Sequence, residues 1–241
     1  FNVRSMTKPM TGTLAQMMID ADRLSPDQPV SRYLSSFTSS SMAAVAVDHL
    51  MTHTSGLPLT CIDRPLTDYA DLAAVAQQAA AAGLEFTPGS KFAYSDAGSD
   101  CLGALLQEVS NVPLGELFQR RLFEPLRMAD TFTELSANDA RGGRVSSDHA
   151  GLKGSWSRFW KPADEPFYPF TMGSQSVYTT PMDYAKFLAL WMDRGRRGEI
   201  RLLSDAAIER GLEPVSVMNY ASGLPGHTLY YGRMWMLWVD D

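Results

Sequence analysis

The sequence predicts an α/β (α+β) protein with a helix-rich body and little sheet. Three observations support this prediction: a long amphipathic stripe that follows Pro9, two helix starts marked by capping residues, and a single segment typical of a sheet strand, Tyr231 to Val239. We therefore expect residues 1–241 to form a single domain.

The helices are expected from hydrophobic spacing and from their end signals. The first begins at or just before Pro9, because a proline in the first turn has no intrahelical hydrogen bond to lose. The helix near residue 181 begins with Thr180 as N-cap and Pro181 as N1, and Ser204 caps another. Residues 136–170 have no clear period and predict a long loop. The apolar stripes or end signals predict helices over 9–21, 69–82, 96–109, 113–122, 180–191 and 204–208.

Composition excludes several classes of function. The chain has a net charge of −6, and its Lys and Arg residues form no basic stripe, so nucleic acid is not an expected partner. No apolar run reaches the length of a membrane-spanning helix. Cys61 and Cys101 lack metal-ligand spacing and are expected to be buried as small hydrophobic residues. We expect no metal and no cofactor, and the sequence indicates neither compartment nor oligomeric state.

Ser5 and Lys8 form an S-x-x-K pattern at the start of the first predicted helix. Helical spacing i, i+3 places the hydroxyl and the amine on one face. A serine hydroxyl becomes a good nucleophile when a neighbouring base removes its proton, and a buried lysine can be that base. The pattern is weak by itself because it occurs often by chance.

Tyr94 is the third candidate, in the run Tyr94-Ser95-Asp96 after the Pro88-Gly89 turn. A tyrosine hydroxyl beside a serine and a lysine can carry a proton to a leaving group and back. The structural alternative is a half-buried tyrosine before a helix that Asp96 caps. The pairing with Ser5 and Lys8 favours the catalytic interpretation.

These segments resemble the serine β-lactamase family, including class C β-lactamases, family VIII carboxylesterases and penicillin-binding proteins. The resemblance rests on their order along the chain, because each piece alone is unspecific. The matching segments are Ser5 to Pro9, Asp27 to Leu34, His49 to Pro58, Pro88 to Asp96, Leu102-Gly103, Phe123 to Thr131 and Gly173 to Leu188.

The resemblance implies a fold in which a helical region packs on an antiparallel sheet. It also implies that Ser5 is acylated, that Lys8 is the base and that Tyr94 is the proton carrier, although Lys8 and Tyr94 compete for the role of base. The expected function is hydrolysis of an ester or amide bond in a small-molecule substrate through an acyl-enzyme, with a carboxylesterase favoured. β-Lactamase and D-alanyl-D-alanine carboxypeptidase are alternatives, and a truncated or non-catalytic binding homologue is an alternative of another class.

The chain departs from the family pattern in three places. Asp96 stands where the family usually has Asn. As an anion at a substrate-binding position, Asp96 would repel a carboxylate on the substrate, which favours uncharged esters. Gln175 and Ser176 replace a frequent Gly-Gly pair. No K-T-G or H-x-G motif follows Tyr94, and 226–228 is a poor match. We therefore expect a domain incomplete at both ends, unstable and barely active when expressed alone.

The remaining candidates are assigned structural roles. His53 and Ser55 lie in a turn and are expected to make structural hydrogen bonds. His49 and His149 have no metal partners at ligand spacing. One aromatic group either lines an acyl pocket or packs a long loop: Trp156, Phe159, Trp160, Phe167, Tyr168 and Phe170.

Overall fold

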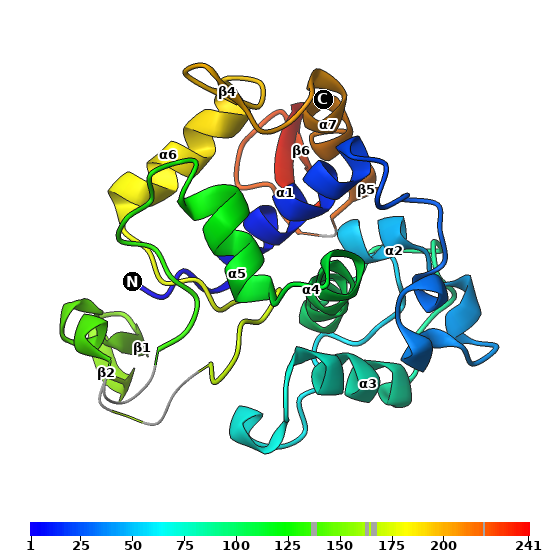
Figure 1. Cartoon of the computed structure of the whole chain (residues 1–241), viewed down its shortest axis with the longest axis horizontal. Coiled ribbons are helices and arrows are strands. Elements are labelled where there is room, and N and C mark those ends of the chain that lie inside the picture. Colours follow the sequence, from blue (N-terminus) through cyan, green and yellow to red (C-terminus); the bar gives the residue numbers. More distant parts are fainter. Residues whose placement is uncertain (136–138, 162–163, 165–167, 219) are drawn as a thin grey trace.

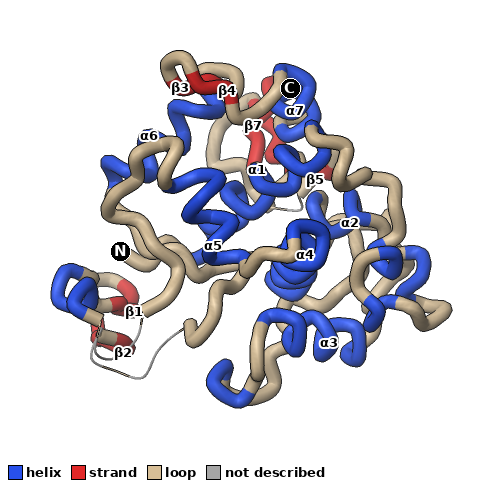
Figure 2. The backbone as a smooth tube through the Cα atoms, in the orientation of Figure 1, coloured by secondary structure: helices blue, strands red, loops and turns tan. Residues whose placement is uncertain are grey.

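The chain is described by a computed structural model that covers residues 1–135, 139–161, 164, 168–218 and 220–241. Helices surround a buried core, and the strands are short (Figures 1 and 2). The α-helices are α1 (Thr7–Asp20), α2 (Val47–Met51), α3 (Leu72–Ala82), α4 (Asp96–Ser110), α5 (Leu114–Phe118), α6 (Pro181–Met192) and α7 (Asp205–Gly211). The strands are β1 (Asp148–Leu152), β2 (Ser155–Trp160), β3 (Arg196–Arg197), β4 (Ile200–Arg201), β5 (Ser216–Val217), β6 (His227–Tyr231) and β7 (Met236–Asp240).

Short helical turns connect these elements. In the described part of the chain, six are 3-10 turns and one, η6, is a π-helical turn that continues α5. Their bounds are η1 (Arg4–Met6), η2 (Val30–Arg32), η3 (Ser35–Phe37), η4 (Met42–Ala44), η5 (Leu66–Asp68), η6 (Gln119–Phe123) and η7 (Ala140–Arg144).

Helices α1 and α4 lie side by side at the centre of the molecule (Figure 1). Met10 and Leu14 of the predicted apolar stripe are at most 1% exposed in α1, and α4 buries an unbroken run over 97–106. Such burial of apolar side chains is the main favourable contribution to folding. The packing of the two helices therefore places the first turn of α1, with Lys8, next to the first turn of α4, with Asp96.

The predicted helix ends agree with the structure at most positions. Thr180 caps α6 by accepting a hydrogen bond from the backbone N–H of Asp183, and Ser204 caps α7. Helix α4 is capped by Ser95, which accepts from the Gly98 N–H, so the structural alternative in which Asp96 is the cap is wrong. The Asp96 side chain is therefore free to face α1.

The predicted strand at the C-terminal end is a hairpin. Strands β6 and β7 pair antiparallel, with Tyr231 opposite Met236, and a turn with Met234 at φ +68° joins them. The single strand expected over 231–239 was wrong because the alternation of side chains spans this turn. Strand β5 adds to the other side of β6. Within the described residues, the strands form one three-stranded sheet and two separate hairpins.

This hairpin packs on the helix that carries Lys8. Met234 in its turn is 1% exposed and donates its backbone N–H to the Met51 carbonyl at 2.9 Å. A Cβ atom on Gly12 of α1 would lie 2.7 Å from the Met234 Cβ, so glycine is required for this approach. The contact places the turn of this hairpin beside α1 and α2.

Residues 136–170 contain a hairpin, which corrects the expected loop. Strands β1 and β2 pair with Ala150 opposite Ser157, and η7 precedes them. Five members of the aromatic group are described, and Phe167 lies outside the described residues. Trp160 and Tyr168 are buried, Phe170 is half-buried, and Trp156 and Phe159 are exposed. No helix in the described part of the chain is long and apolar enough to cross a membrane.

Candidate active site

Ser5 lies at the mouth of α1, in turn η1, and its side chain is exposed while that of Lys8 is 1% exposed. The Lys8 Nζ lies 3.1 Å from the Ser5 Oγ, so the expected contact is present. Arg4, directly before Ser5, has φ +51°, a left-handed conformation that costs a non-glycine residue roughly 1–2 kcal/mol. Backbone conformations of this kind occur at active sites as well as in turns and at helix ends.

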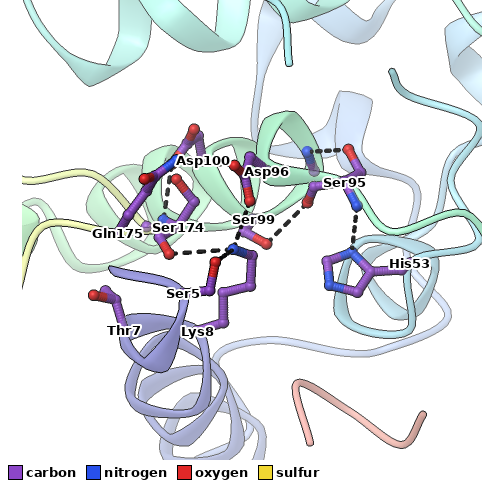
Figure 3. Close-up of polar contacts among 12 residues, drawn as sticks. Ser5, Thr7, Lys8, His53, Ser95, Asp96, Ser99, Asp100, Ser174 and Gln175 are labelled. Carbon is purple, nitrogen blue, oxygen red and sulfur yellow. Dashed lines mark hydrogen bonds and ion pairs between the residues drawn. The ribbon is translucent and has the colours of Figure 1, made fainter. Parts of the chain in front are cut away.

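The Lys8 amine is fully hydrogen-bonded. Besides Ser5, it donates to the Asp96 Oδ1 at 2.6 Å and to the Ser174 carbonyl at 3.2 Å (Figure 3). An ammonium group has three N–H donors, and these acceptors account for all of them. The arrangement satisfies a charge that would otherwise be costly to bury.

Asp96 is held between two side chains. Its Oδ1 forms the ion pair with Lys8, and its Oδ2 accepts from the Gln175 Nε2 at 2.9 Å. The Gln175 amide oxygen in turn accepts from the Tyr168 hydroxyl at 3.0 Å. The departure at Gln175 thus places its side chain at the site. Ser176 is buried and bonds to the Met172 backbone instead.

Tyr94 contacts the site through its ring. The Lys8 Nζ lies 4.7 Å from the ring centroid, a cation–π contact. In the part of the chain that the structure describes, the Tyr94 hydroxyl makes no hydrogen bond. The expectation that it lies within reach of Ser5 remains a prediction, since a catalytic contact can form when substrate binds.

His53 and Ser55 make the structural hydrogen bonds expected of them. The His53 Nδ1 accepts from the Ser95 N–H at 3.2 Å, its Nε2 lies 3.0 Å from the Tyr231 hydroxyl, and Ser55 accepts from the Leu57 N–H. Burial lowers the pKa of His53 well below 6.5, and the Lys8 charge adds to this. A neutral His53 therefore links the start of α4 to β6.

Asp100 and Ser174 were missed by the sequence analysis. Asp100 lies one turn after Asp96 on α4, is 2% exposed, and accepts from the Ser174 N–H at 2.8 Å. Burial raises the pKa of Asp100 to about 7, although the Ser174 hydrogen bond and Lys8 oppose this rise. An aspartate within a buried helical run was the sequence signal that could have identified it.

The other candidates lie away from these contacts. His49 accepts from the Ala46 N–H, and His227 in the 226–228 segment pairs with Asp240. Cys61 and Cys101 are free thiols and are buried as expected. No group of three or more potential metal ligands occurs among the described residues.

Comparison with known proteins identifies the family. A family profile described as Beta-lactamase matches residues 1–241. Esterase EstB of Burkholderia gladioli is 31% identical over 148 residues, which are 54% of this chain and 37% of the esterase. The D-alanyl-D-alanine-carboxypeptidase/endopeptidase AmpH of Escherichia coli K12 is 25% identical over 197 residues, 79% of this chain and 48% of the relative. The chain thus spans half or less of the length of these two relatives.

Solved structures share the fold. A penicillin binding protein from Bacillus halodurans superposes with a TM-score of 0.77 at 25% identity, covering 100% of this chain and 69% of that one. EstCE1, a hydrolase with promiscuous acyltransferase activity, gives a TM-score of 0.79 at 22% identity with the same coverage. The expected β-lactamase and penicillin-binding-protein type of fold is confirmed, and the chain belongs to the Beta-lactamase family.

Proposed function

We propose that this chain carries the nucleophile of a serine hydrolase that forms an acyl-enzyme at Ser5. The observation that carries this proposal is the contact of 3.1 Å between the Oγ of Ser5, an exposed residue, and the Nζ of the buried Lys8 at the mouth of α1. The other serines of this region are committed to structure: Ser95 caps α4 and donates to the Pro58 carbonyl, and Ser55 is 1% exposed.

The ion pair defines how the Ser5 proton moves. An ammonium has no lone pair, so Lys8 accepts the Ser5 proton only as it passes one of its own to Asp96, whose Oδ1 is 2.6 Å away. The Ser5 Oγ then bonds to the carbonyl carbon of the substrate, and the bond to the leaving group breaks. Tyr94 protonates the departing group and is reprotonated from Lys8, and Asp96 returns its proton to Lys8. Water hydrolyses the acyl-enzyme by the reverse transfers.

The charge of the site favours uncharged esters as substrates. Lys8 and Asp96 form a pair with no net charge, and Gln175 occupies the second Asp96 oxygen. A substrate carboxylate therefore finds no uncompensated cation in this pair. The sequence identity of 31% to an esterase supports the same class of substrate. The longer match to a D-alanyl-D-alanine-carboxypeptidase supports hydrolysis of D-alanyl peptides as the second candidate.

Active-site labelling tests the proposal. Purified protein is incubated with a fluorophosphonate probe, digested and mapped, with Ser5→Ala and Ser99→Ala variants alongside. We expect the label on Ser5, none in Ser5→Ala and unchanged labelling in Ser99→Ala, because Ser99 bonds to the Ser95 carbonyl inside α4. The chain is expected to be barely active, and whatever turnover of p-nitrophenyl acetate it has should be lost in Ser5→Ala. A label on Ser55 or Ser95 with Ser5 unmodified, or no label at all, would refute the proposal.

A further inference from the structure

Asp100 is a buried carboxylate that the proposed reaction does not use. It lies on α4 at 2% exposure, and its side-chain hydrogen bond goes to the Ser174 N–H at 2.8 Å. Among the described residues Asp100 has no ion-pair partner, and burial of a carboxylate in that way is costly. Figure 3 shows Asp100 on the opposite side of Ser174 from Lys8.

The segment that Asp100 holds makes two contacts with the site. The Ser174 carbonyl accepts from Lys8 at 3.2 Å, and the next residue, Gln175, donates to Asp96 at 2.9 Å. Gly173 before them packs so closely on α4 that a Cβ would lie 2.2 Å from the Ser99 carbonyl oxygen. The backbone N–H of Ser174 is thus fixed by α4 while its carbonyl meets the amine of α1.

We propose that Asp100 is a positioning residue, whose ionised carboxylate holds the Ser174–Gln175 segment so that this segment orients Lys8 and Asp96 for acylation of Ser5. This inference rests on the proposed serine hydrolase function. A carboxylate accepts an N–H bond about twice as strongly as a neutral group does, so loss of its charge loosens the segment.

The titration of Asp100 falls near neutral pH. Burial raises its pKa to about 7. Two charged groups act on the Asp100 carboxylate: Lys8 of α1 and Asp96 of α4. Three further titratable groups respond to its charge: Cys101 of α4, Cys61 before α3 and Tyr168 before Gly173. Burial raises the pKa of Cys61 and Tyr168 to about 12 and raises that of Cys101 well above its usual value, so these three stay neutral at this pH.

The test compares two substitutions that separate charge from shape. Asp100→Asn keeps an acceptor oxygen for the Ser174 N–H but does not titrate, whereas Asp100→Leu removes the acceptor. Asp68→Asn, which makes the same charge change at an exposed position on η5, is the control. The second-order rate of fluorophosphonate labelling at Ser5 is measured between pH 5 and 9, with each fold checked by circular dichroism.

In the unsubstituted protein and in Asp68→Asn we expect the labelling rate at pH 6 to be about tenfold below its plateau, following one ionisation near 7. Asp100→Asn should lack this step, and Asp100→Leu should label slowly at every pH. If the labelling rate of Asp100→Asn still falls between pH 7 and 6 as in the unsubstituted protein, the proposed role of Asp100 is wrong. The pH profile of Asp100→Asn is sufficient for this test even if Asp100→Leu does not fold. Absence of Ser5 labelling in the unsubstituted protein would instead refute the proposed function.

Discussion

Replacement of Asp96 by Asn should shift the substrate preference toward acids. The substitution removes the partner of an ion pair 2.6 Å long and leaves Lys8 as an uncompensated cation at the site. Asn retains an oxygen for Lys8, and the Gln175 amide can turn over to accept from the new N–H. The packing is therefore preserved while the local charge changes by one unit.

The size of the effect follows from Coulomb's law. For a substrate carboxylate about 6 Å from Asp96, the repulsion is roughly 2.8 kcal/mol at an effective dielectric constant of about 20 and roughly 0.7 kcal/mol at about 80. The Asp96 side chain is 20% exposed, so the true environment lies between these limits. We expect a change of roughly 3- to 100-fold in the preference for an acidic over a neutral substrate.

A matched pair of esters measures this preference. One is a p-nitrophenyl ester whose acyl chain ends in a carboxylate, and the other is its uncharged counterpart of equal length. The ratio of their kcat/KM values cancels any loss of proton transfer that Asp96→Asn also causes. Asp68→Asn serves as the surface control, and the effect should weaken as salt is added. A ratio within twofold of the unsubstituted protein would refute the electrostatic argument.

Two further predictions concern stability. Gly173→Ala should lower the free energy of unfolding by roughly 1–3 kcal/mol, because the new Cβ would lie 2.2 Å from the Ser99 carbonyl oxygen. Gly143→Ala is the control, because its Cβ would meet nothing within 4 Å and should change that free energy little. Equal urea midpoints for the two variants would contradict the prediction. The pKa of His53 in the folded protein lies well below 6.5, so the unfolded state takes up a proton first as the pH falls. The stability that a neutral His53 contributes is therefore present above about pH 6.5 and is lost below it, by up to about 1.4 kcal/mol per pH unit. Urea unfolding between pH 7.5 and 5 should show a flatter dependence in His53→Asn, and an identical slope would contradict it.

Local sequence signals were sufficient where one element decides the outcome. The S-x-x-K spacing depends only on the geometry of one helical turn, and the structure has the Ser5 to Lys8 contact at 3.1 Å. Capping by Thr180 and Ser204 likewise depends on neighbouring backbone groups. The ordered family segments predicted the β-lactamase type of fold, because together they are specific where each alone is not.

Local signals failed where pairing partners are distant or where a turn interrupts a pattern. The strand expected over 231–239 is a turn with strands on either side, and the loop expected over 136–170 contains the β1–β2 hairpin. Hairpin formation depends on cross-strand contacts that a one-dimensional hydrophobic period does not report. Asp96 bonds to Lys8 and Gln175 through its two oxygens, which no local signal predicted, and its expected action on a substrate carboxylate remains a prediction.

The sequence by itself therefore determined the helix start at which Ser5 and Lys8 lie, the order of the family segments and the unusual acid at position 96. Only the tertiary structure decided that Asp96 and the Ser174 carbonyl accept from Lys8, that Gln175 bonds to Asp96 and that Asp100 accepts from the Ser174 N–H. These residues are up to 167 positions from Lys8 in the sequence, as Gln175 is. Their contacts exist because the buried faces of α1 and α4 pack together, and such packing depends on shape and burial in three dimensions.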